Sequence, residues 1–483
     1  MASKTIYTFI LGAFLLVPWH SLYCQSIPDT PPVNLDTVEN TTVRINNIFI
    51  LGNEKTKKSI ITRELSFKVN DTINMHRLIG YQTEDRNKIY NTNLFNLVDI
   101  QILELDSENA DILVKVTERW YLYPGIIFRT SAGDRNFTNW WVNENRNLKR
   151  INYGVRLSKY NLRGRDETLL LTAQFGFENV FLANYVVPYI DKNQKFGLTV
   201  DLGYAEFKNL PYKTENHFLR FVTSETVQKR SFASAVSLSY RGSFYTRHFI
   251  TGGFNRASTT PNIAELNSNY FESGETLQRY FRLAYSFSRD YRDNNTYPLR
   301  GNFISASVGR NGLGIFDDYN RWYLTASYRQ YFDFGKGFFL GTNLTGHIST
   351  EDVPYSRFIG LGFKNYIVRG YEFNVVEGPQ VALFKSSFKK RLFKTAATIP
   401  KRWMPIEQFR RWPLALYAKT FFDAGYVNNY SNYDLNRRLS NKLLYSAGIG
   451  LDFVTIHEIT IRLEQSYNAE GLFNFVVGFE QDL

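Results

Sequence analysis

The chain ends in a strand-like stretch that reads Phe473-Asn474-Phe475-Val476-Val477-Gly478-Phe479-Glu480. Large apolar side chains take every second position in it, and residues 446–453 and 459–464 repeat the alternation. Period-two alternation is typical of β-strands that have one face in an apolar environment. Three such strands in succession predict a sheet with lipid on one face and water on the other, as in a transmembrane β-barrel.

The rest of the chain agrees with a barrel. Of its 483 residues, 16% are aromatic, and no internal run reaches the ~20 apolar residues that a membrane helix needs. A membrane-spanning part must therefore be a closed sheet. Residues 120–483 consist of alternating segments separated by polar turns, and at ~10 residues per tilted strand they predict an all-β barrel of about 16 antiparallel strands.

Residues 1–24 have the pattern of a secretory signal peptide, with Lys4 before an apolar run at residues 6–17. We expect cleavage after Cys24, which leaves a mature chain without cysteine. A lipidated Cys24 is the alternative, but the bulky Tyr23 before it disfavours that interpretation. Residues 25–42 are polar, contain proline and are interpreted as a linker.

Residues 43–119 predict one small α+β domain. The expected elements are a strand at 43–51, a helix capped by Thr56, a second helix before residue 91, and strands at 98–105 and 110–118. In the first of the last two strands Val98, Ile100 and Ile102 alternate with polar residues.

Composition also excludes several functions. The net charge of +12 comes from dispersed basic residues on an exported chain, so we expect contact with outer-membrane lipids and no nucleic acid. The histidines lack the spacing of metal ligands, and no serine stands in a nucleophile elbow. We therefore expect no enzymatic activity, no catalytic residue, no metal and no cofactor.

Several motifs resemble the BamA/TamA superfamily of outer-membrane assembly factors and transporters. The first is Val368-Arg369-Gly370-Tyr371 in a long loop, followed by an aspartate in Phe421-Phe422-Asp423-Ala424-Gly425. Residues 288–301 match the family's Asp-x-Arg-Asp turn, and residues 445–451 match its near-terminal strand. Residues 43–119 resemble its POTRA module, with matches at residues 51–53, 63–65, 89–95 and 116–119.

The resemblance implies that a loop around residues 358–380 folds into the barrel lumen and that Arg369 rests on Asp423. Glu464 is expected as a second lumenal acid, because Lys385 stands where family members often carry one. We interpret the ion pair as structural. Gly478 would lie at the seam between the first and last strands, or would simply make room for a lumenal side chain. Strand 98–105 would receive unfolded clients by strand addition.

One further segment, residues 394–412, is a long connection that mixes basic and aromatic side chains. It is interpreted as an interfacial segment on inner-leaflet head groups, with a turn packed against the barrel as the alternative.

The function implied is an outer-membrane factor, with its POTRA domain in the periplasm, that inserts β-barrel proteins or moves polypeptide or lipid. A single POTRA favours a specialised factor that works with a periplasmic or lipoprotein partner on unfolded outer-membrane polypeptides. The alternatives are a passive channel and a structural anchor for a surface complex.

Overall fold

The computed structural model describes residues 25–26, 42–104, 108–130, 148, 151–316, 320–350, 353–362, 366–402, 410–431, 433–455 and 460–478. The predicted signal peptide and most of the predicted linker lie outside these residues. Among the helices so described, none combines the length and the apolar character needed to cross a membrane.

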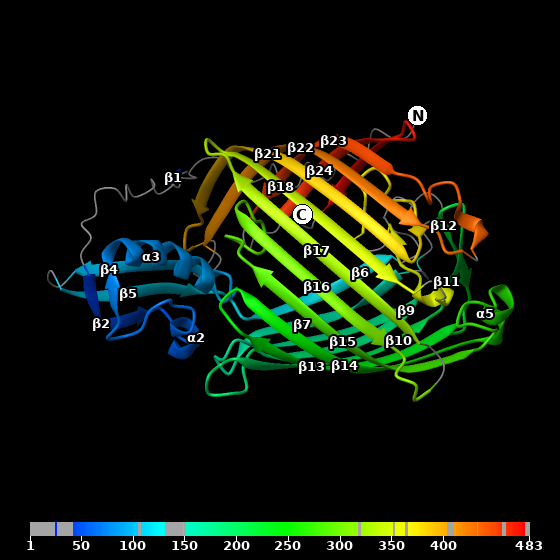
Figure 1. The fold of residues 1–483 in the computed structure, drawn as a ribbon, viewed down its shortest axis with the longest axis horizontal. Coiled ribbons are helices and arrows are strands. Elements are labelled where there is room, and N and C mark those ends of the chain that lie inside the picture. Colours follow the sequence, from blue (N-terminus) through cyan, green and yellow to red (C-terminus); the bar gives the residue numbers. More distant parts are fainter. Residues whose placement is uncertain are drawn as a thin grey trace.

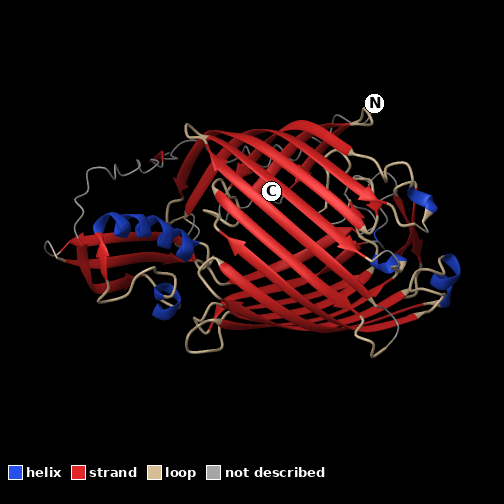
Figure 2. Ribbon diagram, viewed as in Figure 1, coloured by secondary structure: helices blue, strands red, loops and turns tan. Residues whose placement is uncertain are grey.

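In the described part of the chain, sixteen antiparallel strands, joined by the two-residue strand at Gln25–Ser26, form one curved sheet that closes into a cylinder (Figures 1 and 2). The predicted barrel of about 16 strands is therefore confirmed. The cylinder brings the last strand beside the first. The strands are β6 (Leu122–Thr130), β7 (Ile151–Leu162), β8 (Glu167–Gly176), β9 (Glu178–Val187), β10 (Phe196–Phe207), β13 (Lys229–Arg241), β14 (Thr246–Thr259), β15 (Leu277–Asp290), β16 (Gly301–Asn311), β17 (Arg321–Asp333), β18 (Phe338–Ser349), β21 (Gln380–Thr398), β22 (Arg411–Asn428), β23 (Leu444–Val454), β24 (Thr460–Asn468) and β25 (Phe473–Gly478).

The alternation of the last strand sorts its side chains as the sequence predicts. Phe473, Phe475 and Val477 point outward and are 73%, 57% and 50% exposed. Asn474 points into the lumen, where its amide donates to the Gly370 carbonyl. The apolar side chains therefore form the outer wall of the barrel. Exposing them to water would be unfavourable, so this wall is suited to contact with lipid.

The N-terminal domain lies at one end of the cylinder (Figure 1). It consists of β2 (Thr42–Leu51), α2 (Lys58–Thr62), β3 (Thr72–Asn74), α3 (Met75–Tyr90), β4 (Phe95–Glu104) and β5 (Asn109–Glu118). The sheet order is β3-β2-β5-β4, with β2 and β5 parallel. One face of the sheet packs on α2 and α3 through buried Ile45, Ile61, Leu78, Ile89 and Ile112.

One sequence prediction is wrong, and one segment has other bounds than predicted. Thr56 does not cap the first helix: Lys57 holds that position, and the Thr56 hydroxyl instead contacts the Tyr121 hydroxyl and accepts from Asn161. The connection predicted at residues 394–412 is shorter than expected, because β21 and β22 continue their pairing to Thr398 and Arg411. Its interfacial position stays a prediction. Residues 403–409 of this segment lie outside the described part of the chain.

At the opposite end of the cylinder, loops pack into a cap (Figure 2). It contains β11 (Asn209–Glu215), β12 (Phe218–Thr223), α5 (Pro261–Leu266) and the 3-10 turns η4 (Tyr355–Arg357) and η6 (Asp434–Asn436). Buried Leu210, Ile263, Tyr270, Phe271 and Tyr355 form its apolar centre. The cap thus has a core of its own.

Candidate functional site

The loop between β18 and β21 folds back into the lumen. A short ladder joins β19 (Gly360–Leu361) to β20 (Val376–Glu377) and gives the loop its hairpin shape. Its tip turns at Gly370, whose φ of +87° is a left-handed conformation that favours glycine. A Cβ atom there would lie 3.2 Å from the Asn468 Cβ and 3.3 Å from the Ser446 Cβ. The tip is therefore pressed against the inner wall.

Arg369, beside this glycine, forms a two-pronged ion pair with Asp423 of β22. The Arg369 Nε lies 2.8 Å from Asp423 Oδ2, and Nη2 lies 2.5 Å from Oδ1. The Arg369 backbone N–H also donates to Oδ2, at 3.0 Å. The two side chains are 2% and 0% exposed. Charge-assisted, bidentate geometry makes this a strong and directional contact.

The rest of the guanidinium group is also satisfied. Nη1 lies 3.4 Å from Glu464 Oε1 and 3.2 Å from Ser387 Oγ, while Nη2 donates to the Ser386 carbonyl at 3.0 Å. The group stacks over the Phe421 ring at 3.8 Å. Burying the guanidinium group costs desolvation free energy, and these partners offset that cost. Without them the loop would be less stable inside the lumen.

A second cation extends the network toward the end that carries the N-terminal domain. Lys419 Nζ lies 2.7 Å from Glu464 Oε1 and 2.6 Å from Asp452 Oδ1. Asp452 Oδ2 accepts a 2.9 Å hydrogen bond from the Tyr297 hydroxyl. Tyr297 belongs to the turn between β15 and β16, so this turn is connected to the arginine through side chains alone.

Strand periodicity and small residues position the site. On β22 the alternate residues Lys419, Phe421 and Asp423 are buried inside the barrel. Glycines clear the space beside them: a Cβ on Gly425 would lie 2.7 Å from Val368 Cγ2, and one on Gly448 would lie 2.4 Å from the Phe421 ring. Val368 and Tyr371 then pack with Leu361, Val381, Leu383, Val427 and Leu444.

Two further predicted residues have clear surroundings. Lys385 is the cross-strand neighbour of Asp423 and is 6% exposed, so a positive charge stands beside the acid. Gly478 is the cross-strand neighbour of Arg462, and a Cβ there would lie 2.3 Å from Arg462 Nε. This glycine makes room for a lumenal arginine that reaches Glu464 at 3.3 Å. A role at the seam stays a prediction.

The strand predicted to receive clients is an edge strand, but its alternating apolar residues face the domain core. Val98 and Ile100 are each 2% exposed, and Ile102 packs against the same core. The exposed apolar side chains of β4 are Leu97 and Leu103. The carbonyls of Val98 and Ile100 accept from Arg86 and Gln82 of α3, so an added strand would have to displace these side chains.

The N-terminal domain is docked on the turns of the barrel, a contact that the sequence did not predict. Arg241 donates to both carboxylate oxygens of Glu64, at 2.6 Å each. Asn91 donates to the carbonyls of Arg292 and Asp293. Glu64 stands in one of the motifs matched above, but nothing local to Arg241 marks it as the partner.

Burial and charge set the pKa values at this interface. Burial raises the pKa of Glu64, but the hydrogen bond and charge of Arg241, together with Arg63, more than offset it and leave the pKa lowered. Burial raises the pKa of Asp166, in the turn between β7 and β8, to about 7, against the opposing effect of Arg63. The interface therefore holds one firmly charged acid and one that titrates near neutral pH.

The cap contacts the loop between β18 and β21, which we call the arginine loop, from the other side. His217 is fully buried; its Nδ1 lies 3.1 Å from the Val375 carbonyl, and its Nε2 accepts from the Leu439 N–H. Glu377 of the loop accepts from the Thr214 hydroxyl at 2.8 Å and from Asn436. Burial lowers the pKa of His217 to about 4, so the ring is neutral and can accept this bond.

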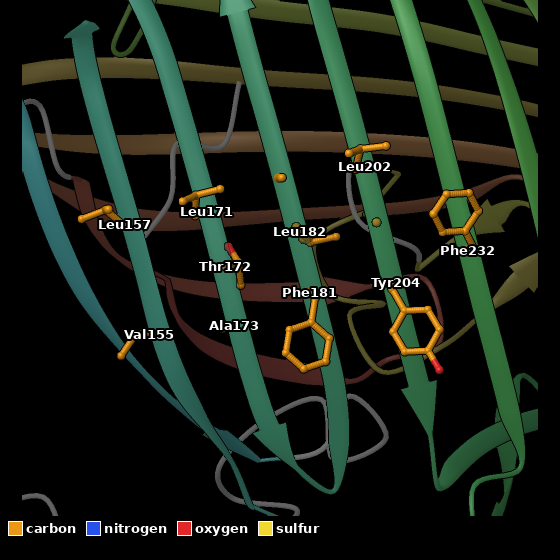
Figure 3. A pocket seen from close by; sticks show the side chains of 12 residues that line it. Val155, Leu157, Leu171, Thr172, Ala173, Phe181, Leu182, Leu202, Tyr204 and Phe232 are labelled. Atoms are coloured by element: carbon orange, nitrogen blue, oxygen red, sulfur yellow. The ribbon is translucent and has the colours of Figure 1, made fainter.

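Within the described residues, no three His, Cys, Asp or Glu side chains gather as a metal site. A hollow of about 450 Å³ opens on the outer wall of β7 to β13 among Leu171, Ala173, Phe181 and Leu202 (Figure 3). Its lining is mostly apolar and faces away from the lumen, as a wall in contact with lipid requires.

Comparisons with known proteins agree with this architecture. The model of the Omp85 superfamily domain matches residues 161–455, and a POTRA model described as a surface antigen variable number repeat matches residues 43–119. No curated protein matches the sequence.

Three solved structures are similar to the chain. They are BamA from Haemophilus ducreyi lacking POTRA domains 1-3 (14% identity, 90% of this chain and 83% of that chain, TM-score 0.49), CdiB from Acinetobacter baumannii (13%, 90% and 73%, 0.48) and CdiB from Escherichia coli (11%, 95% and 92%, 0.47).

Proposed function

Because this chain belongs to the Omp85 superfamily, we propose that it acts in the outer membrane, where it inserts β-barrel proteins or moves polypeptide or lipid. The observation that supports this most is the combination of a POTRA domain docked on one mouth of the barrel with the Arg369 loop fixed inside it. The docked domain would lie in the periplasm and the cap on the cell surface.

Between insertion and transport, the cap favours insertion. Transport through the lumen would require the buried contacts of His217 and Glu377 to open and the arginine loop to leave its seat. Insertion at the barrel wall requires neither. The same packing disfavours a passive channel, which would need a permanently open lumen.

We further propose that clients meet the POTRA domain at the edge of β4. Backbone groups there would pair with an extended client strand, and Leu97 and Leu103 would contact its side chains. Gln82 and Arg86 would act as competitors that a client must displace. A separate periplasmic or lipoprotein partner would supply the contacts that additional POTRA domains provide in relatives.

The test is in-cell photocrosslinking from Leu97, with the same crosslinker at exposed Lys58 on α2 as the matched control. We expect the Leu97 position to trap outer-membrane β-barrel polypeptides and the Lys58 position to trap none. Depletion of the chain should lower the same polypeptides in the outer membrane. Equal yields from both positions, with an unchanged outer-membrane proteome, would rule the proposal out.

A further inference from the structure

The hairpin of β21 and β22 continues past the barrel, at the end that carries the POTRA domain (Figure 1). The ladder between β21 and β18 ends at Lys390, and the ladder between β22 and β23 ends at Ala415. Beyond these points β21 and β22 continue to pair with each other, to Thr398 and Arg411. Among the described residues, the one further pairing there is a short contact of β21 with residues 25–26. We call residues 391–402 and 410–414 the ribbon.

A β-bulge marks the place where the ribbon leaves the barrel. The register of β21 shifts between Arg391 and Phe393, so Leu392 is the inserted residue. A bulge bends a strand and increases its twist. The eight residues from Arg391 to Thr398 then extend the hairpin by roughly 25 Å. A turn between two barrel strands does not require an extension of this length.

One face of the ribbon continues the lipid-facing wall. On β22, Asp423, Phe421 and Lys419 point into the barrel. The residues at the alternate positions, from Phe422 to Trp412, therefore point outward. Trp412 and Phe393 on this face are 42% and 44% exposed. Tryptophan at the margin of an apolar wall is typical of the level of the lipid head groups.

The ribbon is also strongly basic. The basic residues in its sequence are Arg391, Lys394, Lys401, Arg402, Arg410 and Arg411. Lys394, Lys401 and Arg402 are exposed. From residue 391 to residue 414 the sequence contains a single acid, Glu407. A basic segment beside an aromatic face is attracted to anionic lipid surfaces.

Strand addition explains the ribbon less well. The edge of β21 already pairs with β1 (Gln25–Ser26), which lies opposite Ala396 and Thr395. A client strand would have to displace this segment of the chain itself. The lipid surface, in contrast, is continuous with the wall from which the ribbon grows.

We propose that the ribbon is a binding site for anionic phospholipid head groups on the periplasmic leaflet of the outer membrane. Lys394, Lys401, Arg402 and Arg410 supply the charge, while Phe393 and Trp412 enter the head-group layer. The site is separate from the arginine loop and does not depend on the insertion role proposed above. It would hold acidic lipid beside the barrel on the side where the POTRA domain is docked.

The first experiment compares full-length protein purified in mild detergent, offered phosphatidylglycerol or phosphatidylcholine and examined by native mass spectrometry. We expect the wild type to retain phosphatidylglycerol in preference. In the double variant K401Q/R402Q, the preference for phosphatidylglycerol over phosphatidylcholine should fall by a factor of roughly ten. The matched control K192Q/K195Q removes two exposed lysines from the turn between β9 and β10, at the same end of the barrel, and should retain it. Heat-modifiable migration of each variant verifies that the barrel is folded.

The second experiment locates Trp412 in nanodiscs whose lipids carry bromine on the acyl chains. The difference in fluorescence quenching between wild type and W412F isolates the contribution of Trp412. We expect the brominated acyl chains to quench the fluorescence of this residue clearly. Absence of quenching at Trp412, or equal lipid preference in K401Q/R402Q and wild type, overturns the proposal. The proposal is also overturned if Trp412 is quenched but the wild-type protein prefers neither lipid. The ribbon would then contact the membrane without recognising the anionic head group.

Discussion

Arg369 is buried among several polar partners, and we expect the loop to depend on these contacts. The buried pair with Asp423 has two prongs, and Lys385 stands directly across the strand from the acid. When one partner of such a pair is removed, the other charge remains buried without compensation, which costs ~3–5 kcal/mol. Glu464 and Lys419 would then have to rearrange around it.

We therefore expect Arg369→Ala and Asp423→Ala to unseat the loop and to lower the yield of folded, heat-modifiable barrel. Asp423→Ala should be the more severe, because Arg369 then faces Lys385 without an intervening acid. The charge-swapped pair Arg369→Asp with Asp423→Arg should recover part of the loss, since the fork geometry is not restored. Arg230→Ala, at an exposed surface pair with Glu206, is the control and should have little effect. Equal yields for all four variants would refute a holding role for the pair.

Asp166 gives the docked POTRA domain a pH dependence. In the docked structure burial raises its pKa from the ordinary 3.8 to about 7. We expect the pKa to return toward the ordinary value when the domain detaches and water reaches the carboxyl group. Between these values the docked form keeps a proton that the detached form has lost, so docking weakens as the pH rises from about 4 to about 7. Above pH 7 no further change comes from this group. Glu64, whose pKa is lowered, would weaken docking only in more acidic solution.

Asp166→Asn should therefore abolish the weakening of docking between about pH 4 and about pH 7. Spin labels at exposed Lys115 on β5 and Lys192 on the barrel turn can report the distance between domain and barrel. We expect a broadening distance distribution for the wild type as the pH rises, and none for the variant. The same broadening in both proteins would assign the effect to another group.

Among the elements, the turn between β15 and β16 connects distant parts of the molecule. Asn91 of the POTRA domain donates to its carbonyls, and its Tyr297 reaches Asp452 inside the lumen. Tyr297→Phe removes this hydrogen bond but keeps the ring packing against Tyr417, at 5.1 Å. A hydrogen bond to a charged group contributes ~1.5–3 kcal/mol. We expect a matching fall in the thermal stability of the heat-modifiable form, whereas Tyr153→Phe on the outer wall should leave stability unchanged. No difference between the two variants would show that the turn and the lumenal network are independent.

Patterns with a fixed local period were predictable from the sequence, and contacts between remote segments were not. The alternation of β22 placed Asp423 inside the barrel, and the alternation of β25 placed Phe475 outside, because side chains of a strand change face at every residue. The prediction that Thr56 caps the first helix failed, because its hydroxyl contacts Tyr121 and Asn161, which are remote in the sequence. The Glu64–Arg241 contact joins residues far apart in sequence, and nothing in either segment specifies the other.

For the whole molecule, the contacts form one continuous path from the docked POTRA domain to the arginine loop. Asn91 contacts the turn, Tyr297 contacts Asp452, and Lys419 joins Asp452 to Glu464 beside Arg369. The path is contiguous packing and hydrogen bonding, and a coupling energy along it has to be measured. A double-mutant cycle between Tyr297→Phe and Arg369→Lys would measure it, and strictly additive effects on stability would exclude coupling.

The lipid-facing wall makes the most general prediction. Ile250 and Thr251 are neighbours on β14; Ile250 points outward and is 55% exposed, while the Thr251 hydroxyl contacts Ser237 on the inner face. An arginine on the lipid side near mid-bilayer costs ~2–4 kcal/mol, because its charge must stay in hydrocarbon, whereas the lumenal face is polar. Ile250→Arg should therefore lower refolding yield into liposomes much more than Thr251→Arg. Because the two sites are adjacent, strand register and refolding conditions are the same for both. A larger loss from Thr251→Arg would mean that the inner and outer faces of the barrel are assigned the wrong way round.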